Sequence, residues 1–224
     1  MTIEIGFLVF PKVQQLDLTG PYEVLAMVPG ARVHLVAKAL EPVTSATGLV
    51  LTPTITFAEC PALDVICVPG GAGVNPLMED AETLDFLRRQ AERARYVTSV
   101  CTGALVLGAA GLLRGKRATT HWAAHDLLAA FGAIPTEGRV VRDGNLITGG
   151  GVTAGIDFGL TLAAELTDVA TAKAIQLHQE YAPAPPFDAG RPETAGPEIL
   201  AAARERLSVT RQERETIVAR VTRG

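Results

Sequence analysis

The stretch YVTSVCTGALVLG, residues 96–108, reads as a short β-rich run that ends at a cysteine and turns directly into a helix of small apolar residues. A side chain at such a corner lies above the C-terminal end of its strand, where open α/β sheets bind ligands. The first N–H groups and the dipole of the new helix also favour thiolate over thiol. The corner therefore makes Cys101 a candidate nucleophile. The alternative is that Cys101 is a small buried apolar residue, as most free cysteines are.

Apolar runs of strand length alternate along the chain with segments of helical period. We expect strands at 3–10, 32–39, 64–68 and 96–100, an antiparallel excursion at 44–56 and a hairpin at 139–148. We expect helices at 18–27, 79–93, 123–131, 152–166, 171–181 and 198–223, with a Pro-rich loop at 182–197. This alternation predicts an α/β fold with a mostly parallel sheet and helices on both faces.

The composition is that of one globular domain. The 224 residues are 48% hydrophobic and 20% charged, and the formal net charge is −4. A single core serves chains of up to ~250 residues. The absence of a basic block argues against nucleic acid as a partner. No apolar run reaches the ~18 residues of a membrane span and no leader pattern precedes the first strand, so we expect a cytoplasmic protein without a membrane partner.

The cysteines and glycines predict neither a metal site nor a bound nucleotide. Cys60, Cys67 and Cys101 are too few and too irregularly spaced for a disulfide framework, and none belongs to a CxxC pair or a Cys/His cluster. The loop PGGAG, residues 69–73, follows a predicted strand but lacks the spacing of the phosphate loops GxGxxG and GxxxxGK[ST]. A plain tight turn is the other interpretation of this loop.

The glycine loop can meet Cys101, because both follow buried strands and two such strand ends can lie side by side. A backbone N–H of Gly70 or Gly71 would then face the space above the thiol. Together with the N–H of Thr102 it would form an oxyanion-type donor pair.

Asp17 and His121 are the remaining candidates for this sheet edge. Asp17 follows the first strand, and it is either the N-cap of a helix that begins at Leu18 or a partner of the Cys101 thiol. No histidine neighbours Cys101 in the sequence. A Cys-His dyad is possible only through folding, with His121 as the best candidate, and otherwise His121 is structural.

Four motifs taken together resemble the PfpI-type superfamily, the flavodoxin-like relatives of class I glutamine amidotransferases. They are SVCTGALVLGAAGLLRGKRATTHW, VPGGAGV, QLDLTGPYEVL and EYAPAPPFDAG. The resemblance covers nearly the whole chain and is closest to the isocyanide hydratase (isonitrile hydratase) branch. It implies a flavodoxin-like, doubly wound fold, with residues 1–197 as a single domain and residues 198–224 as a C-terminal helical extension of that domain.

The resemblance also implies roles for the residues at the corner. The nucleophile falls on Cys101, its acidic partner on Asp17, the following threonine on Thr102, and the glycine whose amide faces the thiol on Gly71. Thr102 stands where peptidase-like and amidotransferase-like members often carry histidine, so we do not carry peptidase activity over. Ser99 replaces the glycine of the usual G-x-C elbow. The resemblance further implies a homodimeric lyase that needs no cofactor and acts on a small isocyanide.

We therefore expect a covalent hydration of isocyanides. Cys101 would attack the isocyanide carbon to give a thioimidate, with Asp17 as acid and then base and Thr102 holding charge or water, and an N-substituted formamide would leave. Three alternatives remain open. They are a redox or stress-response protein, a glyoxalase- or deglycase-like enzyme, and a relative of the sensor domain of AraC-type regulators. Residues 198–224 are too few for the two helix-turn-helix units of such a regulator.

Overall fold

A seven-stranded sheet forms the centre of the computed structural model, which describes residues 2–223. Every neighbouring pair of its strands is parallel except β10 and β11 at one edge, which form the expected antiparallel hairpin. In spatial order the strands are β10 (Val140–Asp143), β11 (Leu146–Gly149), β7 (Tyr96–Val100), β6 (Val65–Val68), β1 (Ile3–Leu8), β2 (Ala31–Ala37) and β5 (Ile55–Thr56).

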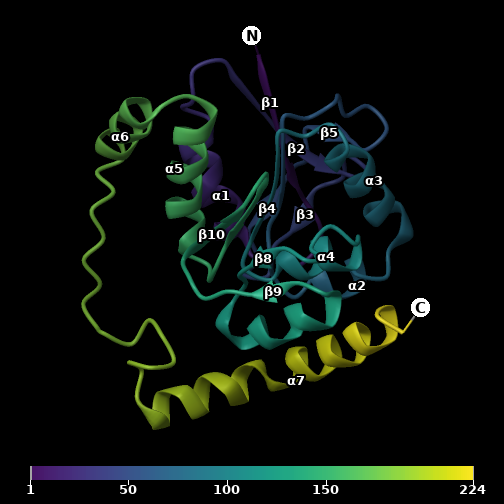
Figure 1. The fold of residues 1–224 in the computed structure, drawn as a ribbon, viewed down its shortest axis with the longest axis vertical. Helices are drawn as coiled ribbons and strands as arrows, with labels where there is room; N and C mark the ends of the chain where they lie inside the picture. The colour runs from purple at the N-terminus through teal and green to yellow at the C-terminus, as the bar shows by residue number, and fades with distance from the viewer. Residues whose placement is uncertain (1, 224) are drawn as a thin grey trace.

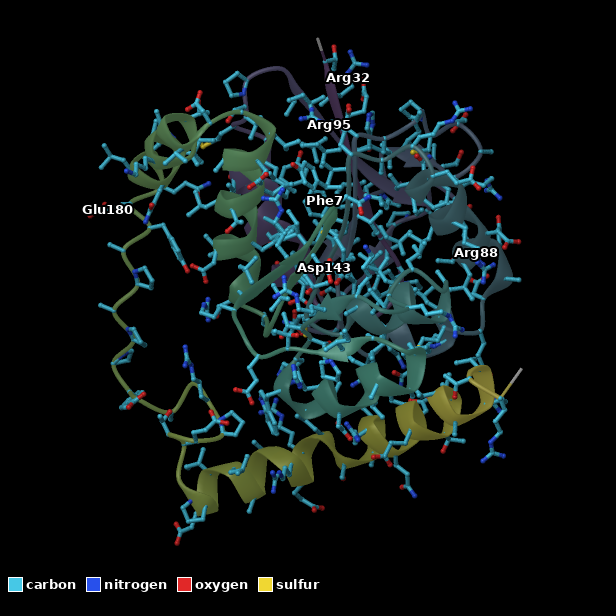
Figure 2. The ribbon with its side chains drawn as sticks, in the orientation of Figure 1. Phe7, Arg32, Arg88, Arg95, Asp143 and Glu180 are labelled. Atoms are coloured by element: carbon cyan, nitrogen blue, oxygen red, sulfur yellow. The ribbon has the colours of Figure 1, made fainter. Side chains whose placement is uncertain are left out.

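The central strands are buried on both faces, as their uninterrupted apolar sequences predict. In β6, Val65 and Cys67 belong to one hydrophobic cluster, whereas Ile66 and Val68 belong to the other. Successive side chains of a strand point to opposite faces, so the two clusters lie on opposite sides of the sheet. Figure 2 shows Phe7 of β1 at the centre of the packed interior.

Helices cover both faces, which confirms the predicted fold class (Figure 1). One cluster contains residues of α1 and α5, and the other contains residues of α2, α3 and α4. The helices are α1 (Gln15–Leu25), α2 (Val74–Leu77), α3 (Ala81–Ala91), α4 (Gly103–Ala109), the 3₁₀ helix η1 (Trp122–Phe131), α5 (Ala154–Leu166), α6 (Val169–His178) and α7 (Pro197–Val221).

The last helix, α7, runs along the outside of η1 at the lower edge of the view in Figure 1. Pro197 occupies its first turn, where the missing N–H is tolerated. Only a few of its residues are buried, among them Arg214, Ile217 and Val218. The two apolar residues join the core cluster on the α4 side of the sheet. A long loop without regular structure connects α6 to α7.

Several element boundaries differ from the expectation. The expected excursion over 44–56 contains the antiparallel pair β3 (Val43–Thr44) and β4 (Val50–Leu51), and then β5, which joins the main sheet beside β2. The helix expected at 123–131 is the 3₁₀ helix η1. A short apolar pattern does not distinguish i+3 from i+4 hydrogen bonding, so it could not predict the helix type. Strands β8 (Arg117–Ala118) and β9 (Ile134–Pro135) form a separate parallel pair.

Helix α1 differs from its expected position in a way that matters for the site. It begins at Gln15 and not at Leu18, with Gln14 as its N-cap. Asp17 therefore lies inside the first turn and does not cap the helix. Within residues 2–223, none of the helices combines the length and the apolar character needed to cross a membrane.

Candidate active site

Three adjacent strands bring the candidate residues to one edge of the sheet. Strands β1, β6 and β7 are neighbours and parallel, so their C-terminal ends lie together. Asp17 lies on α1, beyond the end of β1. Gly70 and Gly71 follow β6, and Cys101 follows β7 directly. This is the meeting of strand ends that the apolar patterns predict, at the position where open α/β sheets bind ligands.

Cys101 occupies a strained backbone corner between β7 and α4. Its φ is +55°, in the left-handed region, which costs a residue other than glycine roughly 1–2 kcal/mol. The hydroxyl of Thr120 donates a 2.6 Å hydrogen bond to the Cys101 carbonyl. Gly103 allows the start of α4 to pack against β6, since a Cβ there would collide with the carbonyl oxygen of Val68. The surrounding contacts thus hold the thiol at the end of its strand.

Asp17 is fully buried beside this corner. Its Oδ2 accepts a 2.9 Å hydrogen bond from the N–H of Gly70. Its Oδ1 is buried and has no hydrogen-bond partner among residues 2–223. A Cβ on Gly70 would lie 2.7 Å from Oδ2 and 2.6 Å from the amide nitrogen of Thr102, so only glycine fits there. The Gly70 amide thus holds the carboxyl group, whereas we expected it to face a ligand above the thiol.

The Gly71 amide is also engaged within the protein. It donates a 3.1 Å hydrogen bond to Oγ1 of Thr102. Gly71 has a φ of +122° and lines the same cavity as Cys101 and Thr102. Its N–H can reach a ligand only when the Thr102 hydroxyl turns away. The amide of Thr102, by contrast, lowers the pKa of the Cys101 thiol, although burial and Asp17 outweigh it.

Burial controls the ionisation of the Cys101/Asp17 pair. Burial raises the pKa of Asp17 from 3.8 to about 7, although the hydrogen bonds from Gly70 and Cys101 oppose the rise. Burial, followed by the nearby Asp17 carboxylate, raises the pKa of Cys101 well above its usual value. The expectation that the start of α4 favours thiolate is therefore outweighed. Two groups this close titrate as a pair that holds one proton over a wide pH range.

A cavity of about 280 Å³ opens onto Cys101. Helix α7 contributes four of its lining residues, none of which is indicated by a sequence motif. The cavity is lined by Gln14, Ala46, Gly71, Ala72, Cys101, Thr102, His121, Ala123, Val152, Leu207, Thr210, Arg211 and Arg214. Asp17 is fully buried and is not among these lining residues.

His121 lines the cavity as a neutral side chain. Burial, together with the positive charge of Arg214, lowers the pKa of His121 from 6.5 to about 4. Its Nδ1 accepts a 3.3 Å hydrogen bond from the N–H of Ala123, which leaves the proton on Nε2. No hydrogen bond joins His121 to Cys101 within the described part of the chain. His121 thus contributes to the cavity wall in this geometry and does not form the Cys-His dyad considered above.

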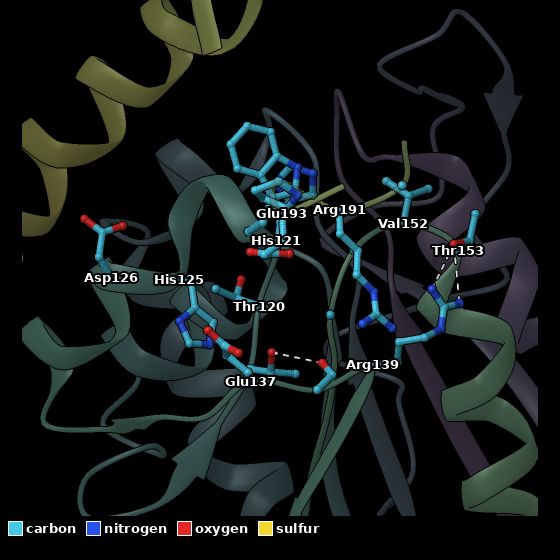
Figure 3. Close-up of a pocket in the computed structure, with 17 residues that line it drawn as sticks. Thr120, His121, His125, Asp126, Glu137, Arg139, Val152, Thr153, Arg191 and Glu193 are labelled. Atoms are coloured by element: carbon cyan, nitrogen blue, oxygen red, sulfur yellow. Dashed lines mark hydrogen bonds between the residues drawn. The ribbon is translucent and has the colours of Figure 1, made fainter. Parts of the chain in front are cut away.

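A larger and more open hollow of about 670 Å³ adjoins this cavity, because both include His121 and Val152 in their lining (Figure 3). Figure 3 shows His125 and Glu137 on one side of it and Arg139 with Thr153 on the other. Its lining contains no cysteine. We therefore assign the chemistry to the smaller cavity, where the buried Cys101/Asp17 pair lies.

The other two cysteines have structural surroundings. Cys67 is fully buried in β6, and burial raises its pKa to about 12. Cys60 is half-buried, and burial raises its pKa to about 11. Among residues 2–223, no three His, Cys, Asp or Glu side chains are grouped so that they could hold a metal ion.

The raised pKa of Asp17 predicts a pH-dependent cost to folding. Between its ordinary pKa of 3.8 and its folded value of about 7, Asp17 releases its proton in the unfolded chain but not in the folded protein. Rising pH therefore stabilises the unfolded state relative to the folded one over this interval. In the Asp17→Asn variant, the side chain at position 17 does not titrate. The free energy of unfolding of the wild type should therefore fall by a few kcal/mol relative to that of the variant between about pH 4 and about pH 8.

Urea unfolding of both proteins across this pH range measures the difference. Effects of titrating groups that do not interact with Asp17 cancel in the comparison, so a difference that stays constant with pH would contradict the raised pKa.

Comparison with known proteins places this geometry among relatives. The family model described as DJ-1/PfpI family matches residues 4–165. An isonitrile hydratase from Pseudomonas putida is 68% identical over 220 residues, which cover 98% of this chain and 96% of that protein. The crystal structure of a ThiJ/PfpI family protein from Pseudomonas syringae has a TM-score of 0.95 and 48% identity, and the match covers 97% of this chain and 91% of that one.

A relative of a different kind is an HTH-type transcriptional regulator from Pseudomonas aeruginosa. It is 32% identical over 169 residues, which cover 70% of this chain but only 45% of the regulator. The similarity thus leaves more than half of the regulator's length without a counterpart in this chain.

Proposed function

The chain belongs to the DJ-1/PfpI family, and on this premise we propose that it hydrates isocyanides, R–N≡C, to N-substituted formamides, R–NH–CHO. The observation that carries the proposal is the buried Cys101/Asp17 pair at the end of a small cavity. The near full-length identity to an isonitrile hydratase supports it. Cys101, Asp17 and Thr102 are the proposed catalytic residues, with Gly71 beside the substrate. Gly70 orients the Asp17 carboxyl group.

The first step forms a bond between sulfur and the isocyanide carbon. The terminal carbon of an isocyanide accepts a nucleophile only when this carbon is protonated or the positive charge on the nitrogen is neutralised. Burial raises the pKa of Asp17 to about 7, so this carboxyl group can carry a proton near neutral pH, and Oδ1, which has no hydrogen-bond partner among residues 2–223, is free to hold it. Transfer of this proton to carbon, with attack by the Cys101 thiolate, gives the thioimidate R–N=CH–S–Cys101 and leaves Asp17 as carboxylate.

The second step adds water and releases the thiol. The Asp17 carboxylate takes a proton from water as the oxygen attacks the thioimidate carbon, and passes this proton to the nitrogen. Loss of the Cys101 sulfur as thiolate, with transfer of the hydroxyl proton of the adduct to Asp17, then gives R–NH–CHO and restores the pair with one proton. The hydroxyl of Thr102, which now accepts from Gly71, is placed to hold the water or the developing charge. Dividing the hydration into two steps lowers the barrier of each.

Incubation with a simple alkyl isocyanide, such as n-butyl isocyanide, tests the proposal. We expect N-butylformamide to appear in proportion to protein concentration, with one oxygen from H₂¹⁸O, and in D₂O with one deuterium on the formyl carbon. A protein-free sample is the control. Methylglyoxal is supplied in a parallel reaction, and production of lactate without any formamide would favour the glyoxalase-like alternative and overturn the proposal.

The proposal also includes a homodimer in the cytoplasm, with residues 1–197 as one domain and residues 198–224 as its extension. Large apolar side chains that a partner could cover are exposed on α6 and the loop after it. They are Val169, Leu177 and Phe187, which are 60%, 81% and 78% exposed. A monomer mass by light scattering would contradict the dimer.

A further inference from the structure

Helix α7 carries a buried positive charge into the candidate active site. Arg214 is only 7% exposed and lines the cavity of Cys101. Its Nε donates a 3.0 Å hydrogen bond to Oδ1 of Asn75, which is a neutral partner. Within residues 2–223, no carboxylate forms an ion pair with it, whereas Arg211 and Arg220 of the same helix are paired. A buried charge without a counter-ion is costly, so its retention points to an anion in the cavity.

Asn75 fixes the orientation of this guanidinium. Asn75 is fully buried, and its Nδ2 donates to Oε2 of Glu213 at 2.8 Å and to the carbonyl of Thr210 at 3.4 Å. These two acceptors identify the amide nitrogen, so Oδ1 must face Arg214. The terminal nitrogens of the guanidinium then have no hydrogen-bond partner in the described chain. They remain available to the cavity.

The charge of Arg214 distinguishes between the two members of the Cys101/Asp17 pair. Arg214 and Cys101 line the same cavity, whereas Asp17 is fully buried and is not part of its lining. The guanidinium lowers the pKa of Cys101, in opposition to burial and to Asp17. The pKa of Asp17 is set instead by burial, Gly70 and the thiol. Within the pair, a positive charge that acts on sulfur favours the arrangement in which sulfur is the anion, in opposition to the larger effects of burial and Asp17.

We propose that Arg214 is a positioning residue whose buried guanidinium stabilises the Cys101 thiolate, so that it increases the fraction of the pair in which sulfur is the anion and Asp17 holds the proton. This arrangement has the nucleophile and the acid that the first step of the proposed hydration requires. The catalytic meaning of Arg214 therefore rests on the proposed function. The effect of Arg214 on the reactivity of the Cys101 thiol is independent of that function, because it can be measured with any electrophile that enters the cavity.

The other charged groups around the cavity leave Arg214 as the main source of positive charge at sulfur. Arg211 is neutralised by Asp126 and Glu215, at 2.6 and 2.7 Å. His121 is uncharged near neutral pH, because its pKa is lowered to about 4. Glu213 receives the hydrogen bond of Asn75 and belongs to the shell around Arg214.

Alkylation of Cys101 by iodoacetamide, followed by peptide mass spectrometry, tests the proposal directly. The reagent is uncharged and reacts with thiolate, so the rate near neutral pH measures the thiolate fraction. In Arg214→Gln, which removes the charge but keeps an N–H donor for Asn75, we expect the rate to fall about tenfold, equivalent to about one pKa unit. In Arg214→Lys, which keeps the charge, the rate should stay within about threefold of wild type.

A second variant neutralises the charge of Arg214 through its hydrogen-bond partner, Asn75. Asn75→Asp leaves Arg214 in place but gives it a carboxylate, so it should slow alkylation as Arg214→Gln does. The matched control is Arg206→Gln, which removes an exposed arginine of α7 outside the cavity lining and should alkylate at the wild-type rate. Circular dichroism and thermal unfolding establish which variants fold. Loosening of the structure would expose the thiol and raise the rate, opposite to the expected change.

Wild-type rates in both Arg214→Gln and Asn75→Asp would overturn the proposal, and so would an equal loss in Arg214→Lys. Turnover of n-butyl isocyanide, measured on the same proteins, separates this result from the proposed function. A wild-type protein that forms no formamide contradicts the hydratase activity. The alkylation rates would still decide the role of Arg214.

Discussion

Cys101→Ala is expected to abolish the formation of N-butylformamide from n-butyl isocyanide, with a loss of at least about 10³-fold. The sulfur is the nucleophile of the proposed mechanism, and His121 and the other cavity residues offer no group that could replace it. The resting geometry supports this assignment, because Cys101 lies at a strained corner that the hydrogen bond from Thr120 holds in place. Gas chromatography of the formamide measures the rate.

The matched control for this substitution is Cys60→Ala. Cys60 is half-buried outside the cavity lining, so its replacement removes a thiol without touching the site, and turnover should stay at the wild-type level. Thermal unfolding of both variants separates loss of chemistry from loss of fold. Full turnover by Cys101→Ala would rule out the covalent mechanism and leave direct addition of water as the remaining path.

The strands that build this site were predictable because their burial is recorded in local sequence. A strand with neighbours on both sides and helices on both faces must be apolar throughout, as Val65–Val68 is. The corner at Cys101 was equally visible, since a strand pattern changes there to a helix of small residues. Gly70 and Gly103 are the reason that the two strand ends can approach, but a glycine in a loop is also compatible with a plain turn.

The position of Asp17 was only partly predictable. The sequence locates it just after the first strand, and the resemblance pairs it with Cys101. Its local interpretation as an N-cap was wrong because α1 begins two residues before it, with Gln14 as cap. Helix boundaries depend on which turn is stabilised by tertiary contacts. Here the hydrogen bond from Gly70, 53 positions away, turns the carboxyl group inward.

The ionisation of the pair and the role of α7 lay outside local sequence patterns. The helix N-terminus at Thr102 favours thiolate, but the opposing effect of burial becomes known only when the chain has folded. Burial wins, and the pKa of Cys101 is raised. Arg214 lies more than 100 residues from the nucleophile, on a helix with many charged residues, and the sequence does not show which of them turn toward the core. Only the tertiary contact with Asn75 places it in the cavity.

Asp17→Asn is expected to lower isocyanide turnover by about 10²–10⁴-fold, the contribution that a positioned acid–base group typically makes. The amide oxygen of asparagine can still accept the hydrogen bond from Gly70, so the local geometry is kept. The amide can neither deliver a proton to the isocyanide carbon nor take one from water. The substitution therefore removes the chemistry of Asp17 with little change in shape.

The pH profile distinguishes this chemical role from a structural one. In wild type, the pair holds two protons below the raised pKa of Asp17, about 7, and one proton above it. Only the form with one proton can combine a thiolate with a protonated acid, so kcat/KM should rise as pH passes through about 7. In Asp17→Asn the residual activity should lose this limb, because the carboxyl group that titrates there is gone. If Asp17→Asn kept the wild-type turnover and the rise of kcat/KM near pH 7, Asp17 would only hold the Gly70 loop. The acid of the reaction would then have to be one of the groups that line the cavity.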